Sequence, residues 1–184
     1  FSLVRIVGSG CPVSAMLVQL QAEIGASQME CRLTRLEDPI STLHPDVPEV
    51  TGQLYDALRQ EDDAHIHLEV HLYEQFSKAL AVLEAQGCIK GLHSWGHRYS
   101  AGIRVVDPTF TMYMAARHEK QRAMKALIER IETCERGKWI HGGELKAELA
   151  LPLPVIAACF DVFEMKGYGL RSRELGRVAY VGRA

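Results

Sequence analysis

Aromatic and basic side chains gather in one short stretch of this chain. The loop from His93 to Tyr99 holds two aromatic rings with cations and imidazoles around them. Aromatic rings stack on nucleobases, and neighbouring cations contact the phosphates. The stretch therefore predicts a nucleic-acid site made of Lys90, His93, Trp95, His97, Arg98 and Tyr99. The alternative is that Trp95 folds back on the core and the loop is merely solvated.

A second basic stretch lies near the end of the chain. Arg171, Arg173 and Arg177 fall in a predicted hairpin around Gly176. Clustered arginines favour contacts with phosphates, so these three join the predicted nucleic-acid-binding residues. A solvated hairpin that balances nearby acids is the alternative.

Other reactive residue types give weaker patterns. His65, His67 and His71 are close in sequence, with Glu69 between them, but no matching set of Cys or His accompanies them. The stretch 8–11 (Gly-Ser-Gly-Cys) precedes a predicted helix but lacks both GxGxxG and the Gly-Lys-Ser/Thr of a phosphate loop. We predict no catalytic residue, metal site or cofactor, and whether the chain belongs to an enzyme stays open.

Composition limits the classes of partner. The 184 residues carry a net charge of −2, although residues 118–184 hold twelve Lys and Arg against nine Asp and Glu. A free-standing non-specific DNA binder is usually more basic, so any nucleic-acid contact must be local or the partner is a protein. Five scattered cysteines without a CxxC pair indicate a reducing, intracellular location, cytoplasmic or nucleoid-associated. No apolar run reaches about 18 residues, so no membrane contact is expected. The start at Phe1 suggests a fragment of a longer protein.

One order of elements is predicted twice: helix, short strand, helix pair, glycine and hairpin. The predicted first copy has helices at 50–61, 69–76 and 77–86, a strand at 65–68, and a hairpin from strands 88–92 and 102–106. Ser77 is its expected N-cap for the third helix. The predicted second copy has helices at 118–135, 143–149 and 154–166, a strand at 138–140, and hairpin strands at 170–174 and 177–181. The apolar spacing of Met124, Leu127, Ile128 and Ile131 marks one inward helix face.

These patterns predict a mainly α fold with small β-hairpins, of the α+β class. Residues 1–48 are expected to form an N-terminal strand, a helix-turn-helix-like segment and a Pro-containing linker from Asp38 to Pro48. Whether that segment is a third copy of the domain stays open. Residues 49–117 and 118–184 are expected to form two domains of the same kind.

The third helix of each copy is a poor reader of DNA bases. A helix that reads the major groove needs exposed Arg, Asn, Gln, Lys or Ser. The first copy offers Ser77, Lys78, Glu84 and Gln86, whereas the second is apolar from Val155 to Phe163. That apolar helix favours burial against another surface, and we predict it as a contact for a protein partner or a homodimer.

The joints between third helix and hairpin carry a family resemblance. Residues 83–89 (Leu-Glu-Ala-Gln-Gly-Cys-Ile) and 163–169 (Phe-Glu-Met-Lys-Gly-Tyr-Gly) resemble the joint common in the winged-helix superfamily. The resemblance covers residues 50–184 and implies tandem winged helix-turn-helix domains, which most often bind nucleic acid.

Narrower resemblances separate two predicted functions. An aromatic-tipped wing is similar to the strand-separating wing of RecQ-family helicases, although helicase motifs and zinc cysteines are absent from the sequence. We therefore expect a non-catalytic module that binds duplex or forked DNA through its wings within a larger DNA-processing protein. Tandem winged domains of low net charge also resemble partner subunits of bacterial condensins, and transcription regulators are a third relative. The alternative is therefore a protein-interaction or dimerisation module of a chromosome-maintenance or transcription-regulatory complex.

Overall fold

The computed structural model of the chain describes residues 40, 43–92, 102–118, 120–172 and 178–182. Within these residues the fold is mixed, with seven helices and two antiparallel sheets of three strands each. This arrangement is of the α+β class, as the sequence predicts. The predicted strand, helices and linker of residues 1–39 lie outside the described residues.

Residues 47–105 form what we term the first unit. Its helices are α3 (Val47–Glu61), α4 (Val70–Gln75) and α5 (Ser77–Ala85). Its strands are β1 (His65–Ile66), β2 (Ile89–Leu92) and β3 (Gly102–Val105). Strand β3 lies in the middle of the sheet, and it pairs with β1 and with β2 in antiparallel register.

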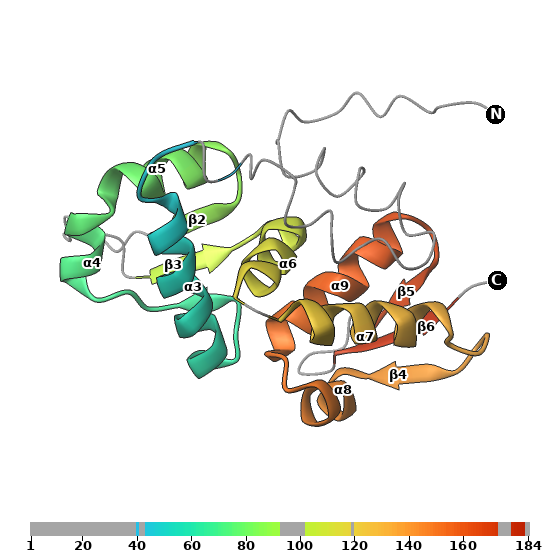
Figure 1. Cartoon of the computed structure of the whole chain (residues 1–184). Helices are drawn as coiled ribbons and strands as arrows, with labels where there is room; N and C mark the ends of the chain where they lie inside the picture. The colour runs from blue at the N-terminus through green and yellow to red at the C-terminus, as the bar shows by residue number, and fades with distance from the viewer. Residues whose placement is uncertain (1–39, 41–42, 93–101, 119, 173–177, 183–184) are drawn as a thin grey trace.

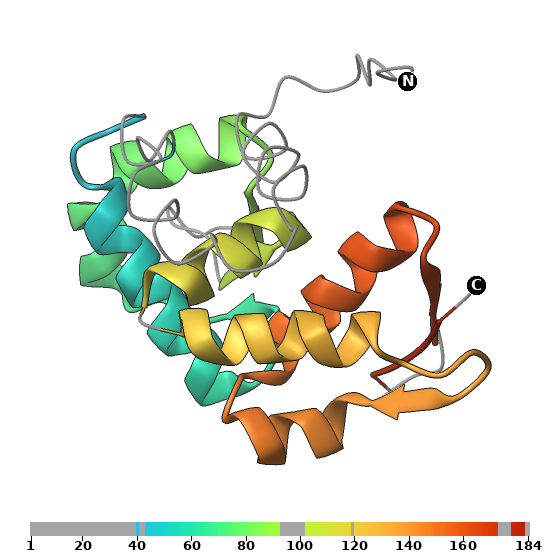
Figure 2. The same cartoon turned by 45° about the vertical axis from the view of Figure 1, so that its right-hand side comes forward.

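Residues 121–182 form the second unit, in the same order. Its helices are α7 (Gln121–Glu132), α8 (Gly142–Leu149) and α9 (Leu153–Met165). Its strands are β4 (Trp139–His141), β5 (Gly169–Arg171) and β6 (Ala179–Gly182), with β6 in the middle. Figures 1 and 2 show α3, α4 and α5 at one end of the molecule and β4, β5 and β6 at the other.

The joint between third helix and hairpin has the same hydrogen bonds in both units. Gly87 and Gly167 end α5 and α9 with φ of 73° and 79°, a conformation that glycine adopts without a steric penalty. The Gly91 N–H donates to Glu84 Oε1 at 2.9 Å, and the Arg171 N–H donates to Glu164 Oε1 at 3.1 Å. Each glutamate therefore fixes the hairpin's first strand against the helix, seven residues away in sequence.

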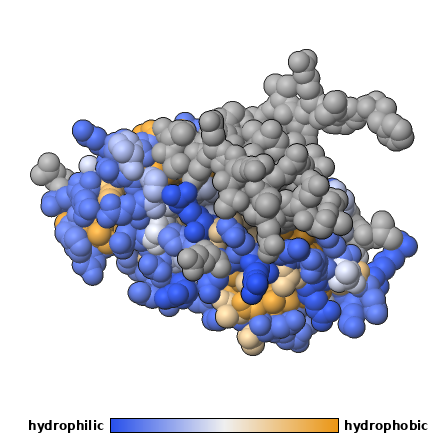
Figure 3. Space-filling view, viewed as in Figure 1, coloured by the Kyte–Doolittle hydropathy of each residue, from blue (hydrophilic) through white to orange (hydrophobic). Residues whose placement is uncertain are grey.

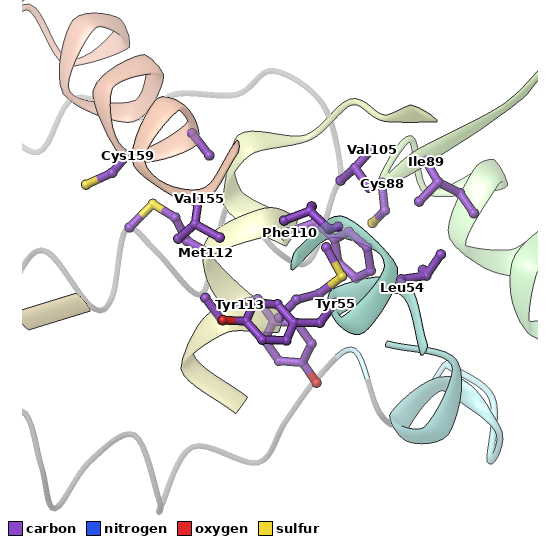
Figure 4. Close-up of a cluster of buried hydrophobic side chains, with 14 of the residues drawn as sticks. Leu54, Tyr55, Cys88, Ile89, Val105, Phe110, Met112, Tyr113, Val155 and Cys159 are labelled. Atoms are coloured by element: carbon purple, nitrogen blue, oxygen red, sulfur yellow. The ribbon is translucent and has the colours of Figure 1, made fainter. Parts of the chain in front are cut away.

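Helix α6 (Pro108–Arg117) lies between the two units and packs against α3, α7 and most extensively α9 (Figure 1). The Asp107 side chain caps it by accepting the Thr109 N–H at 2.8 Å. Its residues from Thr109 to Ala115 are all buried. In the close-up, Phe110 points toward Leu54 and Cys88 of the first unit, whereas Met112 lies near Val155 of α9 (Figure 4). One continuous core therefore runs through both units.

The sequence missed α6 because its apolar residues have no helical spacing. A helix buried on all sides shows no polar face, so the periodic pattern that marks surface helices does not arise. Where such a face exists the prediction is confirmed: Met124, Leu127, Ile128 and Ile131 are the four buried residues of α7.

Two local predictions are wrong. Ser77 is not an N-cap: Phe76 occupies that position, and its side chain makes no capping hydrogen bond. Pro48 is not linker but lies in the first turn of α3, where a missing N–H costs nothing.

Candidate functional site

Lys90 and Arg171 are the two predicted nucleic-acid-binding residues that the structure describes. The other seven lie outside the described residues: His93, Trp95, His97, Arg98, Tyr99, Arg173 and Arg177. Lys90 is exposed on β2, and Arg171 is half-buried on β5. The site is therefore built here from the sheets that carry the two hairpins.

Lys90 is the end of a row of basic residues across the first sheet. It lies opposite Arg104 on β3, and Arg104 lies opposite His65 on β1. All three are exposed, while their strand neighbours Ile66, Ile89 and Ile103 are buried. Alternate residues of a strand face opposite sides of the sheet. The outer face thus presents His65, Arg104 and Lys90, which we call the basic row.

Two members of the basic row form no ion pair with any of the described residues. The side chains of Lys90 and Arg104 have no hydrogen-bond or ion-pair partner there. Like charges directly opposite each other on adjacent strands destabilise a sheet. An anion bound between the two cations would remove that repulsion, so the pair suits a phosphate.

His65 differs, because a carboxylate lies beside it. Its Nδ1 is 3.4 Å from Asp63 Oδ1, and its backbone N–H donates to the same oxygen at 3.3 Å. Partial burial opposes ionisation of Asp63, but these hydrogen bonds prevail and lower the pKa of its carboxyl group. The aspartate therefore limits the positive potential at the His65 end, and the free charge of the row lies at Arg104 and Lys90.

The same row of the second sheet is apolar. Trp139 on β4 lies opposite Val181 on β6, and Val181 lies opposite Leu170 on β5. Trp139 is 48% exposed and Leu170 39% exposed, although both are hydrophobic. We call these three residues the apolar row. Its members occupy the places of His65, Arg104 and Lys90 in an otherwise matching sheet.

Arg171, the other described member of the predicted site, is already paired. Its guanidinium forms an ion pair with the Asp161 carboxylate of α9, and both side chains are largely buried. A phosphate would have to compete with this carboxylate. Arg171 is therefore less available to a nucleic acid than Lys90 or Arg104.

A groove of about 530 Å³ runs between the two units, and Arg104 and Arg171 both line it. Asp62 lies at its edge, where its carboxylate accepts the Leu153 N–H at 2.8 Å and the Lys146 ammonium at 2.6 Å. The aspartate thus joins the end of α3 to the start of α9. The other two acids of the groove are also engaged within the chain, because Asp63 lies beside His65 and Asp161 pairs with Arg171.

The predicted partner surface on α9 is buried within the chain. From Val155 to Phe163, every apolar side chain is at most 9% exposed, and α6 is the helix packed most extensively against α9. The apolar bulk of this helix is thus explained by an intramolecular partner. Figure 3 shows other hydrophobic residues exposed in the half of the molecule that holds α7 and α8, within a mainly hydrophilic surface.

Thiol and imidazole chemistry finds little support in the described residues. Cys88 and Cys159 are buried, and burial raises the pKa of the Cys159 thiol far above its ordinary value. His71 lies beside Glu69, at 3.1 Å, rather than with His65. No cluster of metal-binding side chains occurs in the described part of the chain, and the stretch 8–11 lies outside it.

Two exposed residues escaped the sequence prediction. Arg104 alternates with the inward Ile103 and Val105, a period-2 pattern that marks it as outward-facing. Trp139 could be assigned to a strand, but its exposed face depends on the register with β6, which no local pattern reveals.

Comparisons with known proteins return no match, whether to family models, to curated proteins or to solved structures. None of the helices in the described ranges combines the length and apolarity that crossing a bilayer requires.

Proposed function

We propose that the chain is a non-catalytic, tandem winged-helix module that binds nucleic acid through its first unit, within a larger DNA-processing protein. The observation that carries the proposal is the pair of exposed cations Lys90 and Arg104, which lie on adjacent strands and form no ion pair with a described residue. In the sequence, β2 is followed at once by residues 93–101, which are predicted to form a wing with Trp95 and Arg98, so the basic row would extend into that wing.

The topology supports the winged-helix assignment. A helix, a strand, two helices and a hairpin follow one another in each unit, and the last strand lies in the centre of the sheet. This order is that of a helix-turn-helix with a wing. The third helices support contact through the wings: α9 is buried, and α5 offers Lys78 with only a few other polar groups.

Phosphate contact fits the charges better than base reading. A salt-dependent affinity is expected, because each neutralised phosphate releases counterions. The acidic side chains of the first unit limit non-specific attraction, so binding should be weak and local. Duplex and forked DNA both present phosphates, and the aromatic loop would favour the fork by stacking on unpaired bases.

The test is a polarisation titration of the whole chain with duplex and forked DNA. At about 50 mM salt, where weak phosphate contacts are still measurable, binding is expected, and affinity should fall steeply toward about 200 mM. Absence of binding to both substrates at the lower salt would contradict the proposal. It would then favour the protein-interaction module as the function of the chain.

A further inference from the structure

We propose that the apolar row of the second unit is a stacking platform for single-stranded nucleic acid. In this inference Trp139 stacks on a base, Leu170 and Val181 extend the apolar surface, and Arg136 and Lys138 contact the phosphates. It extends the proposed function to a second surface, but it rests on residues that the basic row does not share.

The indole of Trp139 is available on the outer face of the sheet. Trp139 begins an edge strand, and its side chain is 48% exposed, whereas Tyr180 on the opposite face is buried against Phe160. The Trp139 side chain is therefore not part of the hydrophobic core. Two strand spacings make the row about 10 Å wide, enough for a base on the indole and apolar contact for its neighbour.

The turn before β4 carries two cations within three residues of Trp139 in the sequence. Arg136 and Lys138 are both exposed, and Arg136 has no partner among the described residues. Lys138 Nζ is 3.8 Å from Glu135 Oε2, but both side chains are largely exposed, and such pairs are worth little. The two cations therefore remain open to an anion at the start of β4.

The same turn is held in one conformation. Gly137 has a φ of 75°, the Lys138 N–H donates to the Glu135 carbonyl at 3.1 Å, and the Cys134 thiol donates to the Lys138 carbonyl at 3.3 Å. The backbone that carries Arg136, Lys138 and Trp139 is therefore already ordered before binding, so its ordering adds little to the cost of binding.

Nucleic acid fits this surface better than a protein does. A stable protein interface buries about 800 Å² on each partner around a large apolar core, and three apolar side chains offer much less. An exposed aromatic ring with cations close to it in the sequence is typical of surfaces that bind single strands. Bases must be unpaired to reach the ring, so the proposed ligand is a single strand.

The test uses fluorescence of Trp139 in the whole chain. The sequence has two tryptophans, so Trp95→Phe leaves Trp139 as the source of the tryptophan fluorescence. An oligothymidylate of about 15 nucleotides should quench it at low salt, and a blunt duplex of equal length should quench it far less. Quenching by neither probe, or equally by both, would overturn the proposal.

Two substitutions separate stacking from mere hydrophobic contact. Trp139→Leu keeps an apolar side chain but removes the aromatic face, so polarisation should show oligothymidylate binding weakened about 5-fold to 150-fold. Trp139→Phe should keep most of the affinity. Circular dichroism and melting curves check that both variants fold. If the leucine variant binds as tightly as the parent, the indole is not a stacking platform.

Two further measurements identify the competing explanations. If Trp139 emission changes with protein concentration alone, and Trp139→Leu abolishes that association in sedimentation, the row pairs with a second copy and the proposal fails. The double variant Lys90→Gln/Arg104→Gln should weaken duplex binding yet leave the Trp139 quenching in place. That pattern separates failure of the basic row from failure of the platform.

Discussion

The two units present opposite chemistry from equivalent places on their sheets. In the first unit the outward row is His65, Arg104 and Lys90, whereas in the second it is Trp139, Val181 and Leu170. The hydrogen bonds of the helix-to-hairpin joint are the same in both. Outward positions carry no packing requirement, so they can differ completely while the scaffold stays the same.

The inward positions differ in a more limited way. Tyr180 fills the second unit by stacking on Phe160, with ring centroids 5.3 Å apart, where the first unit has Ile103. Gly169 makes room for the tyrosine ring, while its equivalent Ile89 fills that space with its own side chain. In the interior, a larger residue at one position is therefore balanced by a smaller residue at its neighbour, so the packed volume is kept.

The largest predicted effect concerns the helix that joins the units. Phe110→Ala should cost about 3–5 kcal/mol of unfolding free energy, because Phe110 is fully buried. Urea unfolding of the Trp95→Phe chain can be followed by Trp139 fluorescence, which reports on the second unit, and by far-ultraviolet circular dichroism, which reports on the helices of both units. Both transitions should shift together if α6 unites the cores. A shift confined to the circular dichroism signal would show that the units unfold independently.

A smaller destabilisation is expected when the space that Gly169 leaves for Tyr180 is filled. Gly169→Ala places a Cβ on the Tyr180 hydroxyl and should cost about 1–3 kcal/mol through overpacking. Gly143→Ala is the matched control, since open space surrounds that exposed helical glycine and the change should be neutral or stabilising. Equal melting temperatures for the two variants would contradict the compensation.

The connection at Asp62 should contribute less. Asp62→Ala removes the acceptor for the Leu153 N–H and the partner of Lys146, and we expect the unfolding free energy to fall by about 1–2 kcal/mol. Asp62→Asn, which tolerates the left-handed φ of 54°, should retain part of that stability. A double-mutant cycle with Lys146→Ala measures the ion-pair share, and a coupling of zero would restrict the role of Asp62 to the helix cap.

A pH effect is expected from the tyrosine in the core of the second unit. Burial, assisted by Cys134, Cys159 and Glu164, raises the pKa of Tyr180 to about 12. The unfolded chain therefore ionises this tyrosine before the folded chain does, so stability should decline as pH rises from about 10 to about 12. Tyr180→Phe should reduce that decline in melting curves recorded against pH. If the stability of Tyr180→Phe declined with pH as much as that of the parent chain, the decline would be due to other ionisable groups.

The sequence predicts best what local patterns determine. The apolar stripe of α7 and the glycines after α5 and α9 follow from spacing and backbone freedom, and the structure confirms them. Helix α6 had no polar face to reveal it. The Arg171–Asp161 pair and the Asp62 cap depend on tertiary contacts, which residue order alone does not give. Lys90 was predicted from its loop, but its partner Arg104 required the strand register.

The basic row is tested most directly by the salt dependence of duplex binding. Lys90→Gln/Arg104→Gln should reduce affinity at low salt and lower the slope of log affinity against log salt by about 0.9 for each phosphate that the variant no longer neutralises. Lys78→Gln and Arg59→Gln, which remove exposed charges from α5 and α3, are the matched controls. The account predicts that the controls keep the slope of the parent chain. Equal slopes for the double variant and the parent, or an equal reduction in the controls, would contradict it.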